Sequence, residues 1–395
     1  MTTFASALVG GADVNWTRAD TGVSSRITSV VSIHHTTDSF NRVAGVSERG
    51  EYVGWTVDLN EVISPKLSGV VHSVDEQISN ASIVGRATFG EDGDCGLIFT
   101  SGKDIVLAYT DGTNQALVEL RTDIESTAVL DAAGIDIDGD GSDEIVVLYS
   151  GLQGWIIWEY ADDQGDITSS SSWRYTVCGE RSGYWLEVEP GDIVGSGNPE
   201  LILLSRNMSL IAHVPRNFMR DAQAKIGDGI QIVESLGLVG ERIDKGLRVA
   251  DLTGDGVSEV IAATTNPAAV YYWTLDRTKR VGEWKRELVV QAEVLDIVPI
   301  QSSTGAVVVV STWDGIECWA AGLGGPDCRG SWSYPKDGRP SGNRYSQSQL
   351  AILSTGDRDK VVFVVPTLRN ELFIWFSDPI SIASGGSEDD SEVKR

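Results

Sequence analysis

The chain has 395 residues, of which 41% are hydrophobic, enough for one large domain built from repeats around a substantial core. Its formal net charge of −26 at pH 7 argues against binding to nucleic acid or to an anionic membrane surface, because such a chain repels phosphate. The 43 glycines, together with the scarcity of long amphipathic patterns, favour many short strands joined by turns.

The N-terminal segment MTTFASALVGGADVNW has no basic residues ahead of its short apolar run, so it does not have the pattern of a signal peptide. No stretch approaches the roughly 18 apolar residues that span a bilayer. The four cysteines are widely scattered (Cys95, Cys178, Cys318 and Cys328) and form no CxxC pair. We therefore expect a cytoplasmic protein with free thiols, with a Cys318–Cys328 bridge as the alternative.

Apolar runs recur along the chain at intervals of 47 to 67 residues. The first covers Val30–Thr36, and the others begin at Leu97, Ile145, Leu201, Val260, Val307 and Val361. After the first, each run is followed by a short turn and another strand: Ile105–Tyr109, Trp155–Tyr160, Leu210–Val214, Val270–Leu275, Ile316–Ala320 and Leu372–Phe376. Strands containing Trp or Tyr complete several units. Repeats of this length with several strands each predict propeller blades.

We therefore expect an all-β fold, a seven-bladed β-propeller that occupies residues 1–384 as a single domain. The N-terminal segment Phe4–Trp16 is expected to close the ring against the last blade. Residues 385–395 are predicted to form an acidic disordered tail.

Two loops carry acidic residues at regular spacing ahead of apolar strands. The oxygens at positions 1, 3 and 5 of such a tight loop converge on a hard cation, position 7 can offer its carbonyl, and the acid at position 9 closes the shell. The expected ligands are Asp136, Asp138, Asp140, Ser142 (main chain) and Glu144 in the first loop, and Asp251, Thr253, Asp255, Val257 (main chain) and Glu259 in the second. An acidic surface turn is the alternative, but two copies at equivalent places in a repeat favour structural Ca²⁺.

These loops resemble the FG-GAP or VCBS repeats of integrin-α-type propellers, whose ligands fall on the same ten positions. The resemblance implies the fold and says little about function. Asp192–Glu200 keeps the frame but has no acid at positions 3 and 5, and Thr88–Gly96 and Ser354–Val361 depart further. We expect these three loops to fold without metal.

The sequence contains no GxSxG, HExxH, Walker loop or GxGxxG unit, so no organic cofactor and no nucleophile is predicted. A pocket is instead expected at the face opposite the metal loops, formed by turns and inter-blade connections. Its candidate residues are His35, Lys103, Tyr184, Trp185, Arg206, Asn266, Trp313 and Arg369. Aromatic area and forked donors of this kind suit a small, flat ligand with polar edges, although ordinary solvated turns are the alternative for each residue.

Three function classes fit a propeller of this kind: a lectin, a protein-interaction scaffold and an enzyme. The turns GLQG, RNMS, TNPA, TWDG and TLRN all differ, which disfavours the repeated sugar sites of a lectin. In fold type, size and divergent turns the chain resembles the cytosolic fungal propellers that act as hetero-Diels–Alderases in tropolonic sesquiterpenoid pathways. This resemblance implies a cofactor-independent pericyclase with a small-molecule substrate, and it assigns no catalytic residue. The oligomeric state stays open.

Overall fold

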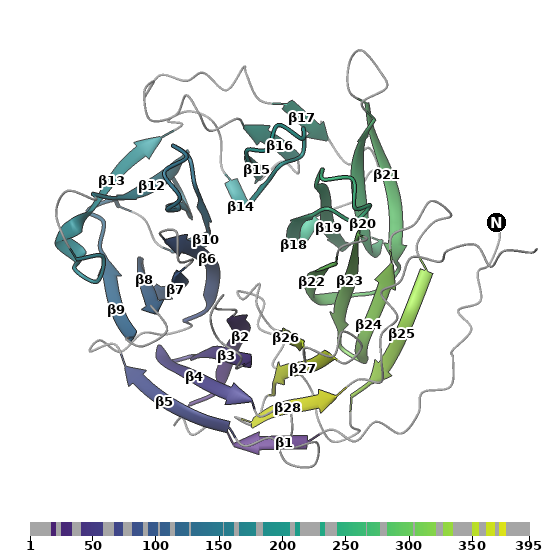
Figure 1. The fold of residues 1–395 in the computed structure, drawn as a ribbon, viewed down its shortest axis with the longest axis horizontal. Coiled ribbons are helices and arrows are strands. Elements are labelled where there is room, and N and C mark those ends of the chain that lie inside the picture. The colour runs from purple at the N-terminus through teal and green to yellow at the C-terminus, as the bar shows by residue number, and fades with distance from the viewer. Residues whose placement is uncertain are drawn as a thin grey trace, which may run out of the picture.

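The computed structural model shows an all-β chain, as the sequence predicts. It describes residues 17–20, 25–33, 41–57, 67–73, 81–89, 94–101, 103–110, 115–125, 128–152, 154–161, 166–178, 185–205, 210–213, 230–233, 243–265, 267–276, 283–302, 305–320, 327–334, 350–354, 361–367 and 371–376. Within these ranges the strands form seven four-stranded antiparallel sheets arranged around a central axis (Figure 1). The only described helical segment is a short 3₁₀ turn, η2 (Ser170–Ser172).

The first three sheets take their strands in chain order. They are β2 (Ile27–Ile33), β3 (Asn41–Ser47), β4 (Glu51–Val57) and β5 (Leu67–Ser73); β6 (Ile83–Phe89), β7 (Asp94–Ser101), β8 (Asp104–Thr110) and β9 (Gln115–Leu120); and β10 (Val129–Ile135), β11 (Glu144–Tyr149), β12 (Trp155–Tyr160) and β13 (Trp173–Cys178).

Three further sheets follow the same rule. They are β14 (Trp185–Gly191), β15 (Glu200–Ser205), β16 (Leu210–His213) and β17 (Ile230–Val233); β18 (Ile243–Ala250), β19 (Glu259–Thr265), β20 (Ala268–Asp276) and β21 (Glu283–Val290); and β22 (Val294–Ser302), β23 (Gly305–Thr312), β24 (Gly315–Ala320) and β25 (Asp327–Ser333).

The last sheet joins the two ends of the chain. Strands β26 (Ala351–Ser354), β27 (Val361–Pro366) and β28 (Glu371–Phe376) are completed by β1 (Thr17–Asp20), which pairs with β28 so that Thr17 faces Ile374. An N-terminal strand therefore closes the ring, as predicted, but through residues 17–20. The predicted closing segment Phe4–Trp16 and the predicted tail at 385–395 lie outside the described residues.

The innermost strand of each sheet is its first described strand in chain order, apart from β1 (Figure 1). The apolar runs that begin near Leu97 and Ile145 form second strands, so they lie one strand away from the axis, and all six residues of β11 are buried. The predicted run Val30–Thr36 is different, because it falls on the innermost strand β2. In the first sheet the strand equivalent to the other apolar runs is the second strand, β3. The predicted interval from Val30 to Leu97 was too long because it started from β2 instead.

Apolar side chains fill the space between consecutive sheets. One cluster joins the β6–β9 and β10–β13 sheets through residues such as Leu107, Ile145 and Trp173. Another joins the β10–β13 and β14–β17 sheets through Trp155, Trp185 and Leu203. Second strands bury both faces in this way, which accounts for their continuous apolar sequences.

The innermost strands share a shift of register near their N-terminal ends. In six of the sheets the shift falls between Ile27 and Ser29, Ile83 and Gly85, Val129 and Asp131, Trp185 and Glu187, Ile243 and Lys245, and Val294 and Asp296. A bulge of this kind re-aims the side chain that follows it. Here it turns several polar side chains toward the neighbouring sheet.

These side chains accept backbone N–H groups across the gap between sheets. The distances are 2.8 Å from Ile83 N to Ser29 Oγ, 2.8 Å from Val188 N to Asp131 Oδ2, 2.8 Å from Leu247 N to Glu187 Oε2 and 3.0 Å from Leu350 N to Asp296 Oδ2. At the equivalent place in β6 stands Gly85, where an added Cβ would lie 2.1 Å from the carbonyl oxygen of Ala132. The sheets are therefore joined near the axis by polar links or by direct backbone contact.

Candidate functional site

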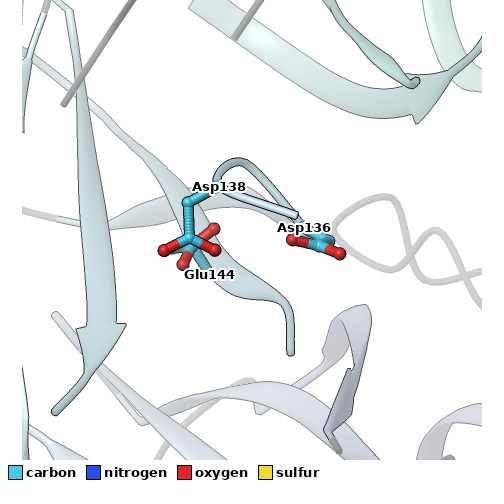
Figure 2. A group of neighbouring side chains, drawn as sticks. All are labelled: Asp136, Asp138 and Glu144. Atoms are coloured by element: carbon cyan, nitrogen blue, oxygen red, sulfur yellow. The ribbon is translucent and has the colours of Figure 1, made fainter. Parts of the chain in front are cut away.

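The first acidic loop, 136–143, joins the innermost strand β10 to β11. Carboxylate oxygens of Asp136, Asp138 and Glu144 lie within 4.8 Å of one another (Figure 2). Gly139 and Gly141 have φ values of 82° and 89°, which only glycine adopts without strain. These glycines let the loop turn sharply enough to bring the three acids together.

Backbone hydrogen bonds fix these carboxylates inside the loop. The N–H groups of Gly139 and Gly141 donate to Asp136 at 2.6 and 3.1 Å, and the N–H of Ile137 donates to Glu144 at 2.8 Å. Asp140, the predicted fifth-position ligand, accepts the N–H of Ser142 at 2.8 Å. The structure thus brings three of the five predicted ligand residues into one group and keeps the other two in the same turn.

The second acidic loop, 251–258, repeats this arrangement. The N–H groups of Gly254 and Gly256 donate to Asp251 at 2.7 and 2.8 Å, and the N–H of Leu252 donates to Glu259 at 2.7 Å. Asp255 accepts the N–H of Val257 at 2.9 Å. The two loops therefore present their acids on the same backbone frame.

The loop at Asp192–Glu200 keeps this frame without the middle acids. Gly197 donates to Asp192 at 2.7 Å and Ile193 donates to Glu200 at 2.9 Å, as in the two acidic loops. At position 5, Ser196 takes the place of an aspartate. The frame therefore forms from the acids at positions 1 and 9 together with the glycines.

Each acidic loop also contacts the preceding sheet, at or just after the C-terminal end of its innermost strand. The N–H of Asp143 donates to Thr88 O at 2.8 Å, and the N–H of Thr88 donates back to the Asp143 carboxylate at 2.7 Å. In the second loop, Ser258 donates to Asp192 O at 2.9 Å. The loops therefore link neighbouring sheets at one face of the ring, which we call the loop face.

Burial makes the closing acids of both loops costly to ionise. It raises the pKa of Glu144 to about 7 and that of Glu259 to about 7, and neighbouring aspartates add to both shifts. A positive charge placed among these acids would remove this penalty. The donor set, all hard oxygens on one turn, fits a calcium ion.

The predicted pocket residues are only partly placed by the structure. Lys103 and Trp313 lie in turns that follow second strands, at the end of the sheets away from the loop face, and we call this end the turn face. Both are exposed, Trp313 to 41%. His35, Tyr184, Arg206, Asn266 and Arg369 lie outside the described residues.

Trp185 does not lie at a mouth. Its side chain is 2% exposed and belongs to the cluster between the β10–β13 and β14–β17 sheets. Its ring lies edge-on to that of Trp155, with 6.3 Å between centroids. The prediction of Trp185 as a ligand residue is therefore wrong, because the connection that carries it has already become the start of β14.

An axial cavity of about 250 Å³ lies between the innermost strands. Small residues form much of its wall, among them Gly85, Ala132, Ala133 and Gly134. Charged residues form another part: Arg86 from β6, Glu189 from β14, Arg248 from β18 and Asp296 from β22. The cavity is therefore asymmetric, and its charged residues come from strands, whereas the predicted pocket residues were assigned to turns and connections.

The Arg248–Asp296 pair organises the charged wall. A guanidinium nitrogen of Arg248 lies 3.0 Å from the Asp296 carboxylate, with side chains 12% and 1% exposed. Arg248 also donates to Leu247 O at 2.8 Å, and Asp296 accepts the N–H of Leu350. This buried pair thereby joins three consecutive sheets beside the cavity.

Buried carboxyl groups surround that pair. Desolvation raises the pKa of Asp131 well above its usual range, with Glu187 and Glu189 adding to the shift, and burial also raises the pKa of Glu189. The anions Asp296, Glu189, Glu187 and Asp131 in turn raise the pKa of Arg248 against its own desolvation. Arg248 therefore stays charged, while the carboxyl groups near the axis are the ones that can take up protons.

Comparison with known proteins gives the fold. No protein-family model matches the chain, and no curated protein matches it. The solved structure of BBS1N in complex with ARL6DN is similar with a TM-score of 0.54 and 12% identity, over 92% of this chain and 98% of that one. The β-propeller domain of Cps50 (Swd1) from Myceliophteria thermophila is similar with a TM-score of 0.53 and 13% identity, over 92% and 99%. The fold is a β-propeller.

Among the residues that the structure describes, no helix is long and apolar enough to cross a membrane. Cys178 and Cys318 are buried, Cys328 is exposed, and all three are thiols. The alternative of a Cys318–Cys328 bridge is therefore wrong. The strand register explains this, because Cys328 pairs with Trp319 and Cys318 pairs with Gly330.

Proposed function

We propose that this propeller binds one small organic molecule in its axial cavity and acts as a cofactor-independent pericyclase of the hetero-Diels–Alderase class. The observation that supports this most directly is the asymmetric axial cavity with apolar and charged walls. A cycloaddition needs no nucleophile or cofactor, only a pocket that orients its partners and stabilises charge on a carbonyl oxygen. The guanidinium group of Arg86, on the cavity wall, is a suitable donor.

The reaction itself tests this proposal. The protein is incubated with a tropolone-derived quinone methide precursor and a sesquiterpene alkene, and the rate and stereochemistry of the cycloadduct are compared with those of the uncatalysed reaction. Ser32→Phe should abolish the acceleration, because Ser32 lines the cavity and a ring would fill it. Ser171→Phe, on the exposed η2 turn, is the matched control and should have no effect. A racemic product formed at the uncatalysed rate contradicts the proposal.

A protein-interaction scaffold is the second candidate function. BBS1N, to which this chain is similar in fold, is in complex with ARL6DN. Trp313 is one of two large hydrophobic residues that stand exposed in the described part of the chain, and it lies on the turn face. A partner captured through that face would be lost in Trp313→Ala and kept in Ser32→Phe. The reverse pattern favours the cavity.

We also propose that the two acidic loops bind structural Ca²⁺. Asp136, Asp138, Asp140, Glu144 and the Ser142 carbonyl would hold one ion. Asp251, Thr253, Asp255, Glu259 and the Val257 carbonyl would hold the other. The ion would supply positive charge to buried acids and would take no part in chemistry at the axis. In this proposal each of the seven sheets is one blade, and two of the seven blades bind metal.

A further inference from the structure

Two of the four charged residues on the cavity wall, Arg248 and Asp296, form an ion pair with each other. Arg248 is engaged by Asp296 and by Leu247 O, and Asp296 accepts the N–H groups of Leu350 and Ile297. Opposite charges in contact cancel at longer range. This pair therefore positions the wall and offers little net charge to a ligand.

The other two charged residues, Arg86 and Glu189, are differently placed. In the part of the chain that the structure describes, neither side chain has a hydrogen bond or an ion pair within 4 Å. Arg86 is exposed toward the cavity, and Glu189 is close enough to feel the charges of both Arg86 and Arg248. They are therefore the two groups on the wall with free capacity for a ligand.

The two groups differ in how easily they lose their charge. A guanidinium stays protonated at any pH a protein tolerates. Burial raises the pKa of Glu189, with Asp296 adding to the shift and Arg248 and Arg86 opposing it. The charge of Glu189 in turn raises the pKa of Asp131, so these two carboxyl groups disfavour each other's ionisation. When a ligand enters, Glu189 is thus the group that changes state, and a positive site at Arg86 remains.

We propose that the axial cavity binds one small organic anion, with Arg86 as its charged donor and the Glu189 carboxyl as a second group that contacts the ligand's oxygens. This inference rests on the proposed small-molecule site and adds the chemical class of its ligand: a compact molecule with a carboxylate, enolate or phenolate edge. The small residues Ala132, Ala133 and Gly134 leave room for a flat body beside that edge.

Uptake of a proton by Glu189 makes binding dependent on pH. A bound anion raises the pKa of Glu189 further, so the complex is favoured below that pKa and weakens as the pH rises through it. Asp131, whose pKa is also raised, lies off the cavity wall, so the Glu189→Gln variant is needed to assign the pH dependence to Glu189.

Three probes of the same planar shape test which ligand charge the cavity prefers: the anion benzoate, the neutral benzamide and the cation benzamidine. Each is titrated calorimetrically into the full chain at pH 6 and pH 8.5. We expect one benzoate per chain, with affinity at least tenfold higher at pH 6, and no comparable binding of benzamidine. Preferential binding of benzamidine would show that the carboxylates dominate the cavity and would overturn the inference.

Variants assign the roles of the two groups. Arg86→Met should weaken benzoate at least tenfold, and Arg86→Lys should weaken it less. Arg174→Met, at an exposed position of strand β13, is the matched loss of one positive charge and should change nothing. Glu189→Gln should keep the affinity and remove its pH dependence. An unaltered pH dependence in Glu189→Gln, or unaltered affinity in a folded Arg86→Met, contradicts the assignment.

The outcome separates this inference from the proposed function. Benzoate binding without cycloaddition would support the anion site and count against the pericyclase. Cycloaddition that Ser32→Phe abolishes, without benzoate binding at either pH, would support the pericyclase and refute the anion site.

Discussion

The Asp131 carboxylate accepts the backbone N–H of Val188 at 2.8 Å and so joins the innermost strands of two consecutive sheets. Its second oxygen, Oδ1, is buried and has no hydrogen-bond partner among the described residues. Asp131 therefore stabilises the ring through one oxygen, while its charge opposes folding.

This division of roles predicts different effects for two substitutions. Asp131→Ala leaves the Val188 N–H buried without an acceptor and should cost about 1–3 kcal/mol at low pH, and less at high pH, where it also removes the buried charge. Asp131→Asn keeps an acceptor and removes the charge, so it should be as stable as the parent at low pH.

The pH dependence of the Asn variant follows from the raised pKa of Asp131. Between its unfolded and folded pKa values the folded state binds more protons, so the parent loses stability as the pH rises. Asp131→Asn should lack this loss and exceed the parent at high pH. Urea unfolding from pH 5 to pH 9 measures the difference, and parallel curves would argue against a buried, hard-to-ionise carboxyl.

The buried pair between Arg248 and Asp296 should be far more sensitive than an exposed one. Arg248→Met leaves several carboxyl groups near the axis without their cation and should cost about 3–5 kcal/mol at pH 7.5. Part of that loss should be regained at pH 5.5, where those groups can protonate. Lys285→Met is the matched control, because it breaks a pair with Glu287 in which the Lys285 side chain is 73% exposed, and it should cost about 0–1 kcal/mol.

Gly85 and Gly191 should respond differently to alanine, although the nearest atom is equally close at both. An added Cβ at Gly85 would lie 2.1 Å from the carbonyl oxygen of Ala132, and at Gly191 it would lie 2.1 Å from Cγ1 of Val249. A valine side chain can rotate away, whereas a backbone can move only with its sheet. Gly85→Ala should therefore lower the free energy of unfolding by about 3 kcal/mol, the upper end of the usual range for overpacking. Gly191→Ala should lower it by less. Equal losses by thermal unfolding would contradict this reasoning.

Calcium should stabilise the fold without reaching the cavity. At a free concentration of one hundred times Kd, each bound ion adds about 2.7 kcal/mol, so EGTA should lower the Tm. Asp140→Ala and Asp255→Ala should lower the Tm in calcium and reduce the effect of EGTA.

The 192–200 loop, which we expect to bind no metal, supplies the control for that experiment. Ser196→Ala changes the equivalent fifth position of the 192–200 loop and should leave the response to EGTA unchanged. Benzoate binding should survive both aspartate substitutions, because the loops follow the C-terminal ends of the innermost strands. A variant that loses benzoate but not stability would contradict the assignment.

Strands with continuous apolar sequences were predictable, and the innermost strands were not. Runs such as Glu144–Tyr149 bury both faces against neighbouring sheets, so their sequence alone marks them. By contrast, Ile83–Phe89 and Ile243–Ala250 line the axis and carry bulges, so they mix glycine, arginine and apolar residues without a period. The predicted run Val30–Thr36 was the exception, because its described residues, 30–33, belong to an innermost strand that is apolar enough to be mistaken for a second strand.

The acidic loops were predictable because their spacing encodes their geometry, and the charged wall of the cavity was not. Arg206 and Arg369 were selected as residues of turns, yet the described charges near the axis come from strands. One signal was available: Glu189 and Arg248 each stand three residues before the first position of a loop, at Asp192 and Asp251. Which of these charges pair across sheets depends on contacts between distant parts of the chain, which no local pattern contains.

The strand that closes the ring constrains how the protein is made. Strand β1 leaves the ribosome hundreds of residues before its partner β28. Its backbone N–H and C=O groups therefore have no strand to pair with until the last part of the chain has been synthesised. During that interval an unpaired strand edge is open to pairing with other chains. Synthesis that stops before Glu371–Phe376 should thus yield a chain with nearly every sheet formed and two unmatched edges, a species prone to join with its own copies.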